Sequence, residues 1–217
     1  MNRPVCLSTI LGYGADMSAT RTHHPDRPAP RTDPAGPAQR LLTTASNLFA
    51  AQGIRAVGID TILREAGVAK ASLYSSYGSK DALVIAYLNE LDQADRKRWN
   101  TKTSGLEDPV EKLLAFFDLA AAAARKRQFR GCLYANAATE FPGDTLDPVR
   151  AHRLWMREQL SALLRDAAVP NAAATAARIQ LIYDGALTAS KLDRSTAPIT
   201  LARQMAAELV TSLREQT

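Results

Sequence analysis

The feature that most constrains this fold is a pair of short helical segments hinged on one glycine. In the stretch EAGVAKASLYSSYGSK (65–80), Gly67 separates a segment at 59–66 from another at about 69–76. A glycine turn of this kind is typical of a helix-turn-helix, whose second helix can lie in a DNA major groove. The same pattern also occurs as ordinary structure, so the spacing alone leaves both interpretations open.

Helical periodicity continues on both sides of this stretch and predicts an all-α protein. A helix from Ala38 to the capping Gly53 carries its apolar residues on one face, and another runs from the N-cap Ser79 to about Trp99. Aromatic residues make up only 6% of the chain, and we find neither strand alternation nor internal repeats. Alanine and leucine dominate the apolar content, which favours helices over sheets.

The chain divides into three predicted parts: an arm at 1–37, a helix-turn-helix domain at 38–83 and a larger helical domain at 84–217. The arm holds six of the eleven prolines and no helical periodicity, so we expect it to be disordered. It could be a passive tail, it could touch DNA through its arginines, or Met17 could be the true start.

The larger domain has strong helix starts and two long C-terminal helices. Asp108-Pro109 and Asp147-Pro148 each place an acidic residue before a proline, which predicts an acidic cap. The last two helices are predicted at about 172–192 and 198–214, and the first of them is apolar nearly all round. A helix without a polar face is buried on two sides, so we expect a second subunit to cover one of them.

Charge and cysteine usage narrow the function classes. Residues 40–105 hold nine basic and six acidic side chains, a net charge of +3 out of the total of +5, as expected of a domain that faces a nucleic acid. Cys6 and Cys132 are too few for a disulfide framework, which predicts a cytoplasmic protein. No stretch is long and apolar enough for a membrane span. We predict no cofactor, no metal site and no catalytic residues, because the sequence lacks a phosphate-binding glycine loop and metal-ligand spacing.

The second helix of the pair offers two kinds of DNA contact. Lys70, Ala71 and Tyr74 are expected to reach base edges, where lysine donates to guanine and the apolar groups meet thymine methyls. The expected backbone contacts come from short hydroxyls and one amine: Ser72, Ser75, Ser76 and Lys80.

These residues resemble the DNA-binding domain of the TetR family of bacterial transcriptional regulators over 40–83. The first helix matches by an apolar pair followed by glycine: Leu48, Phe49 and Gly53. The turn and recognition helix match at Ala66, Gly67, Val68, Leu73, Tyr74, Tyr77, Ser79 and Lys80. Two capping positions depart from the family pattern. Gly58 stands where the family has Thr or Ser, so a phosphate contact there would use backbone amides, and Ala69 stands where Ser normally caps the recognition helix.

The resemblance extends to the larger domain. RGCLYANAATEF (130–141) is similar to a TetR subgroup with a Gly-Cys signature, and the family implies an effector pocket and dimerisation through the last two helices. Aromatic residues with polar tips form the predicted ligand-binding set: Phe117, Leu133, Tyr134, Asn136, Phe141, Trp155, Met156 and Tyr183. The same residues also describe an ordinary core. His152 is expected to be a hydrogen-bonded core residue.

The resemblance implies a homodimeric regulator, a repressor that a small-molecule effector releases from a palindromic operator in double-stranded DNA. Two alternatives remain open at this point. One is a helical ligand-binding or interaction module with lost DNA binding, supported by the missing caps at Gly58 and Ala69. The other is a redox-sensing regulator driven by Cys132, whose thiol lies close in sequence to Arg127 and Arg130.

Overall fold

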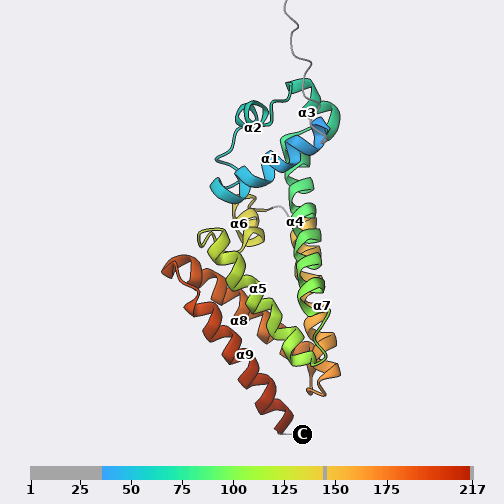
Figure 1. The fold of residues 1–217 in the computed structure, drawn as a ribbon, viewed down its shortest axis with the longest axis vertical. Helices are drawn as coiled ribbons and strands as arrows, with labels where there is room; N and C mark the ends of the chain where they lie inside the picture. The colour runs from blue at the N-terminus through green and yellow to red at the C-terminus, as the bar shows by residue number, and fades with distance from the viewer. Residues whose placement is uncertain (1–35, 144–145, 216–217) are drawn as a thin grey trace, which may run out of the picture. The chain divides into compact units, whose positions relative to one another are not determined.

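The computed structural model describes residues 36–143 and 146–215, and these fold into helices without strands, as predicted (Figure 1). The predicted arm therefore lies almost wholly outside the described residues. The helices are α1 (Pro37–Gln52), α2 (Ile59–Ala66), α3 (Lys70–Tyr77), α4 (Lys80–Thr103), α5 (Pro109–Lys126), α6 (Leu133–Glu140), α7 (Asp147–Asp166), α8 (Ala172–Asp193) and α9 (Ala197–Glu215). None of the described helices is long and apolar enough to cross a membrane.

Local capping chemistry sets most of these helix starts. Ser79 accepts a hydrogen bond from the amide of Ala82 at 3.0 Å, and Asp108 accepts one from Val110 at 2.9 Å, as the sequence predicts. The prediction for Asp147 is wrong by one position. Leu146 is the N-cap and Asp147 is the first helical residue, so its carboxylate meets the helix dipole without acting as the cap.

Buried side chains gather in two clusters that α4 connects. The first cluster joins α1 to α3 with the first half of α4, and it includes Leu133, Tyr134 and Ala137 of α6. The second joins α5, α7, α8 and α9 with Trp99 near the end of α4. Because the described residues belong to one compact unit, the predicted division at residues 83 and 84 stays a prediction.

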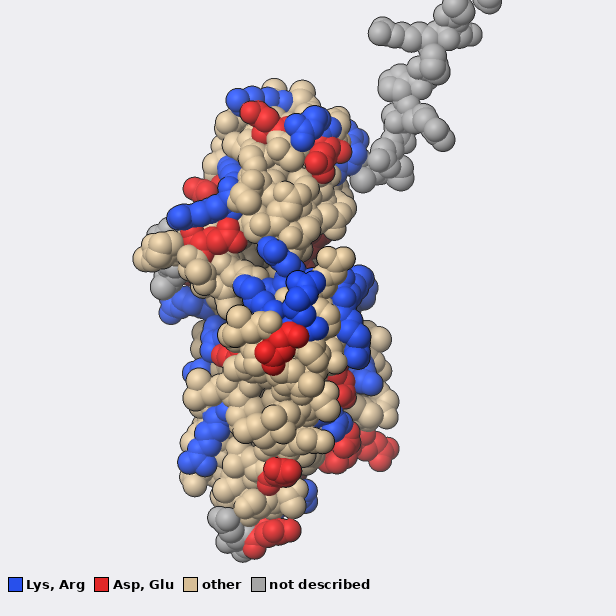
Figure 2. Space-filling view, turned by 90° about the vertical axis from the view of Figure 1, so that its left-hand side faces the viewer, with Lys and Arg blue, Asp and Glu red and all other residues tan. Residues whose placement is uncertain are grey.

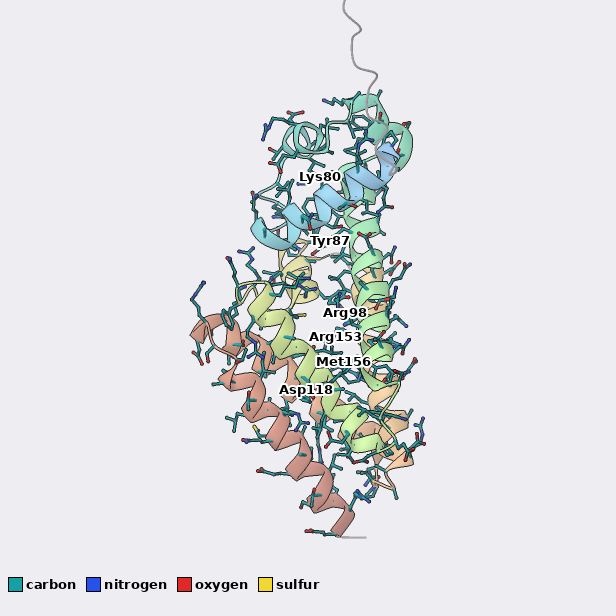
Figure 3. The ribbon with its side chains drawn as sticks, viewed as in Figure 1. Lys80, Tyr87, Arg98, Asp118, Arg153 and Met156 are labelled. Atoms are coloured by element: carbon teal, nitrogen blue, oxygen red, sulfur yellow. The ribbon has the colours of Figure 1, made fainter. Side chains whose placement is uncertain are left out.

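Polar ties hold the helices of the second cluster in register. Arg203 of α9 donates from Nε to Asp118 of α5 at 3.0 Å, and Arg153 of α7 pairs with Asp184 of α8 at 2.8 Å. Figure 3 labels Asp118 and Arg153. These ion pairs are partly exposed, so the apolar cluster beneath them supplies most of the stability.

Candidate functional site

Helices α2 and α3 form the predicted helix-turn-helix, and buried side chains hold both of them against the core. Ile62 and Leu73 are fully buried, and Ala66 is nearly so. Gly67 adopts the left-handed conformation with φ of +61°, which a residue with a Cβ atom rarely adopts. The turn therefore fixes the angle of α3, and the buried Leu73 fixes its rotation.

The opposite face of α3 is open to solvent. Tyr74 is 48% exposed, an unusual setting for a large aromatic side chain. Lys70, Ala71, Ser75 and Ser76 are also exposed. Of the remaining candidates, Ser72 is half-buried and Gly58 is exposed. The structure thus brings the residues expected to reach base edges onto one free surface.

The two positions that depart from the TetR pattern lack a side-chain cap. Gly58 and Ala69 are N-caps of α2 and α3, and neither makes a side-chain capping hydrogen bond. At the other end of α3, the hydroxyl of Tyr77 donates to the carbonyl of Ala38 at 2.8 Å and connects α3 to the start of α1.

Lys80 is hydrogen-bonded within the protein, whereas we expected its amine to face a DNA phosphate. Its Nζ donates to the carbonyl of Ile54 at 2.8 Å and lies 5.9 Å from the ring centre of Phe49. The amine is half-buried against the loop between α1 and α2. Its expected contact with a DNA phosphate stays a prediction, and that contact would require the amine to turn outward.

Glu140, the last residue of α6, holds the same loop between α1 and α2. Its carboxylate accepts from the amides of Ile54 at 3.1 Å and Arg55 at 2.6 Å. A Cβ atom at Gly53 would lie 3.1 Å from Glu140 Oε1, so glycine leaves room for the carboxylate. We call this contact the Glu140 clamp. Sequence reasoning missed it because the partners are more than eighty residues apart.

A small inner cavity of about 90 Å³ lies between α4, α5, α7, α8 and the start of α6. Three aromatic rings form one wall: Trp99 and Phe116 stack at 5.3 Å between ring centres, and Trp155 meets both of them edge to face. Five predicted ligand residues line it: Leu133, Tyr134, Trp155, Met156 and Tyr183. The aromatic wall favours a flat apolar group.

Three predicted ligand residues do not line this cavity. Phe117 is 1% exposed and packs edge to face on Tyr183, so it supports the wall from behind. The side-chain amide of Asn136 instead donates to the carbonyl of Arg130 at 2.9 Å, which links α6 to the segment that precedes it. Phe141 packs in the first cluster, with the guanidinium of Arg55 5.8 Å from its ring centre.

A polar network closes one side of the inner cavity. The Tyr134 hydroxyl donates to Asp95 at 2.8 Å, and the ring stacks on His152 with centres 3.9 Å apart. Nδ1 of His152 lies 2.8 Å from Asp92; since a carboxylate accepts, His152 carries the proton there. Burial lowers the pKa of His152, while Asp92 opposes that shift. The expected hydrogen-bonded core histidine is therefore present, although it also lines the cavity.

A larger groove of about 770 Å³ opens beside the inner cavity, between α1, α4 and the end of α5. The two spaces share five lining residues, and these are Arg98, Leu119, Ala123, Arg127 and Leu133. Tyr87 lines the groove, and burial raises its pKa to about 12. Along α4, Figure 3 shows Tyr87 closer to α1 and Arg98 closer to Met156.

Gly131 and Cys132 connect α5 to α6 at the edge of the inner cavity. Gly131 has φ of +74°, a conformation that favours glycine, and a Cβ atom there would lie 3.0 Å from the Lys191 side chain, which would have to shift. The Cys132 sulfur accepts from the amide of Ala135 at 3.5 Å and caps α6. Burial raises the pKa of the Cys132 thiol, which favours the unreactive protonated form.

Exposed apolar side chains gather on α8 and α9. Leu181 is 71% exposed and Leu192 76% on α8, while Leu201 is 57% exposed and Met205 46% on α9. A monomeric surface seldom leaves so many large apolar groups together in water. Within the described residues, no group of three or more His, Cys, Asp or Glu side chains could hold a metal ion.

The region that carries this geometry matches one known family. Residues 41–87 match the family described as bacterial regulatory proteins, tetR family. The HTH-type transcriptional regulator LmrA of Bacillus subtilis is 33% identical over 79 residues, 36% of this chain and 42% of LmrA. The HTH-type transcriptional repressor KstR2 of Mycolicibacterium smegmatis is 28% identical over 114 residues, 52% of this chain and 54% of KstR2. The chain thus spans about half the length, or less, of these curated relatives.

Solved structures extend the likeness to most of the chain. A TetR-family transcriptional regulator from Streptomyces coelicolor has a TM-score of 0.74 at 29% identity, covering 82% of this chain and 96% of its own. The reduced form of NemR from E. coli has a TM-score of 0.68 at 22% identity, covering 78% and 94%, and shows the fold alone. Residues 41–87 therefore match the model of this family, within a chain that has the fold of these solved regulators.

Proposed function

We propose that this protein is a homodimeric, cytoplasmic transcriptional regulator, a repressor that leaves a palindromic operator when a small molecule binds. The observation that carries this proposal is the presentation of α3. The helix is fixed by the buried Leu73 and the Gly67 turn, and it exposes Tyr74 and its neighbours within the region that matches the family. The test is selection of bound fragments from random DNA by the purified protein, which should enrich a palindromic sequence.

The apolar stripes on α8 and α9 support the dimer part of the proposal. Leu181 and Leu201 are expected to meet the same helices of a second copy, because a two-fold interface buries the same surface on both subunits. We call the proposed helix-turn-helix domain at 38–83 the head. The two heads of one dimer would then contact half-sites about 34–36 Å apart, or at a multiple of that distance. The proposed domain boundary at residues 83 and 84 leaves α4 as the connection between head and dimer.

Two elements link the inner cavity to the head. Helix α4 lines the cavity through Asp95, Arg98 and Trp99, and it begins directly after α3. Helix α6 starts beside the cavity, with Cys132 as its N-cap, and ends at the Glu140 clamp. A ligand that displaces the start of α6 or the middle of α4 would shift the head. This works only if the ligand binds the two arrangements with different affinities.

Replacing Glu140 with alanine should loosen the head without touching the DNA surface. The amides of Ile54 and Arg55 would lose their charged acceptor, so we expect unfolding free energy to fall by about 1–3 kcal/mol. Amide hydrogen exchange at Ile54 and Arg55 should accelerate, because these two amides lose their partner. Glu140→Gln, which keeps one carbonyl acceptor, should lose less.

Glu158→Ala provides the matched control for the clamp, since Glu158 is exposed on α7. It should leave stability and the exchange of both amides unchanged. Unchanged exchange at Ile54 and Arg55 in Glu140→Ala would show that the carboxylate does not hold the loop in solution.

The proposed assignment to the Gly-Cys subgroup gives Cys132 a structural role, with Gly131 making the turn and the sulfur capping α6. We expect Cys132→Ser to leave DNA binding and its response to hydrogen peroxide unchanged. The reason is that burial raises the pKa of the thiol and leaves little reactive thiolate. Operator binding measured before and after oxidant treatment checks this. A response present in the wild type and lost in Cys132→Ser would favour the redox-sensing alternative.

A further inference from the structure

The walls of the inner cavity and the outer groove, which share five lining residues and which we treat as joined, contain hydrogen-bond donors without a partner. The indole Nε1 of Trp99 is buried and has no hydrogen-bond partner among the described residues, and Trp99 itself is only 9% exposed. The Nε of Arg130, a residue that lines the outer groove, is also buried and has no hydrogen-bond partner among the described residues. Both are N–H donors, and a buried donor without an acceptor costs about 1–3 kcal/mol. Two such donors on adjoining spaces indicate an acceptor that binds there.

The acidic groups of the same walls already have partners. Asp95 accepts from the Tyr134 hydroxyl and pairs with Arg98, while Glu90 accepts from the Ser46 hydroxyl at 3.0 Å. The two wall carboxylates thus have partners, whereas two buried wall donors have none among the described residues. A ligand that supplied mainly donors would leave the Trp99 and Arg130 N–H groups unmatched.

Positive charge predominates around the outer groove. The linings of both spaces together hold four basic side chains, Arg98, Lys126, Arg127 and Arg130, against the two carboxylates of Asp95 and Glu90. Figure 2 shows Lys and Arg side chains gathered midway along the face that it presents. Arg98 is already paired with Asp95, which leaves Lys126, Arg127 and Arg130 against Glu90, so a positive surplus is available to an anion.

The inner cavity limits what can enter beyond the charged groove. Its volume of about 90 Å³ and its wall of Trp99, Phe116 and Trp155 suit a single flat ring. The rest of a larger ligand must lie in the outer groove, among the arginines. The chemistry therefore changes from aromatic to cationic along the joined spaces.

We infer that the joined cavities bind an amphipathic organic anion, with a planar apolar ring against Trp99, Phe116 and Trp155 and an acidic group toward Arg130 and Arg127. This inference deepens the proposed function and rests on it only for the effect of the ligand on DNA binding. The acid would accept from the Arg130 Nε–H, and a further acceptor atom near the ring would satisfy the Trp99 Nε1–H. Arginine suits this role because its planar fork matches a carboxylate.

The test uses a matched pair of probes, 4-phenylbutyrate and its neutral amide, 4-phenylbutanamide. The two differ in charge but share the ring, the chain and a carbonyl. Trp99 and Trp155 are the two tryptophans of the chain and both line the inner cavity, so intrinsic fluorescence reports directly on this space. We expect the acid to bind the full chain at least about tenfold more tightly than the amide, the size of a charge-assisted hydrogen bond.

Arg130→Gln should reduce the preference for the acid to less than about threefold, because it removes the guanidinium but keeps a polar side chain. Arg125→Gln is the matched control: it removes the same charge five residues away, from an exposed side chain that lines neither space. That variant should keep the wild-type preference. If Arg130→Gln does not fold, Lys126→Gln at the exposed edge of the groove should show a smaller loss of preference.

Equal affinity for the acid and the amide in the wild type would overturn the inference. So would the failure of both probes to change fluorescence or to give heat in calorimetry at millimolar concentration. DNA binding is measured separately. A probe that binds with the expected preference yet leaves operator affinity unchanged would contradict the proposed release mechanism and support the ligand class.

Discussion

Tyr74→Ala is expected to abolish preference for the operator while leaving the fold intact. The side chain is 48% exposed on α3, so its removal costs no core packing. Each good base contact contributes about 1–3 kcal/mol, and a dimer makes it twice, so affinity should fall at least roughly thirtyfold. Fluorescence anisotropy with the selected operator and with a scrambled duplex measures the effect. Binding to the scrambled duplex should change little, because it depends on phosphates.

Lys70→Ala gives a second measurement on the same helix. Lys70 is expected to reach base edges, so its loss should weaken operator binding. If it also contacts a phosphate, the salt dependence of affinity should flatten by about one unit for that contact. Lys102→Ala is the charge-matched control, since Lys102 is exposed near the opposite end of α4.

Tyr74→Ala with full operator selectivity would show that α3 does not read the sequence and would favour the interaction-module alternative.

Leu181→Glu is expected to convert the protein to monomers and thereby to remove tight operator binding. Leu181 is 71% exposed in the protomer, and in the proposed dimer the new carboxylate would be buried without a partner. An unpaired buried charge costs about 3–5 kcal/mol, which raises the dimer dissociation constant at least about a hundredfold. Analytical ultracentrifugation at several concentrations measures it, and thermal unfolding checks that the protomer still folds.

Gly185→Arg tests the same proposed interface by adding a bulky side chain to α8. Gly185 lies one turn after Leu181 on the exposed side of α8, and a Cβ atom there would meet nothing within 4 Å. Arginine is a better helix former than glycine by about 0.5–1 kcal/mol, so the helix itself gains stability. A bulky side chain should nevertheless prevent close approach of a partner helix. Loss of the dimer without loss of helix content would therefore locate the interface.

Leu154→Glu is the control for both interface variants. Leu154 is another large apolar residue, 53% exposed, but it lies on α7, outside the proposed interface. It should leave the dimer intact. A dimer that survives Leu181→Glu and Gly185→Arg but fails in Leu154→Glu would move the interface away from α8 and α9.

Local chemistry allowed much of the fold to be predicted. The turn at Gly67 and the cap at Ser79 each follow from a single residue and its immediate neighbours. The burial of Leu73 opposite the exposed Tyr74 follows from helical periodicity, because successive residues on a helix are about 100° apart. For the same reason the sequence indicated an additional buried face on α8 before any partner was considered.

Periodicity could not say which interior a buried side chain would reach. Phe116 lines the inner cavity whereas Phe117, one position further, packs behind its wall on Tyr183. Trp99 was expected only as the end of a helix, yet α4 continues to Thr103 and Trp99 forms part of the cavity wall. These assignments depend on how α4, α5 and α7 pack, which residues near in sequence do not determine.

The all-α class, the short helix α3 and its outward face could be predicted from the residues alone, because these depend on spacing within a few helical turns. The Glu140 clamp, the internal hydrogen bond of Lys80 and the unpartnered donors of Trp99 and Arg130 became apparent only in the folded chain. Each of these depends on groups that chain folding brings within hydrogen-bond distance, or leaves without a partner. Sequence spacing contains no information about such distances until the helices are packed.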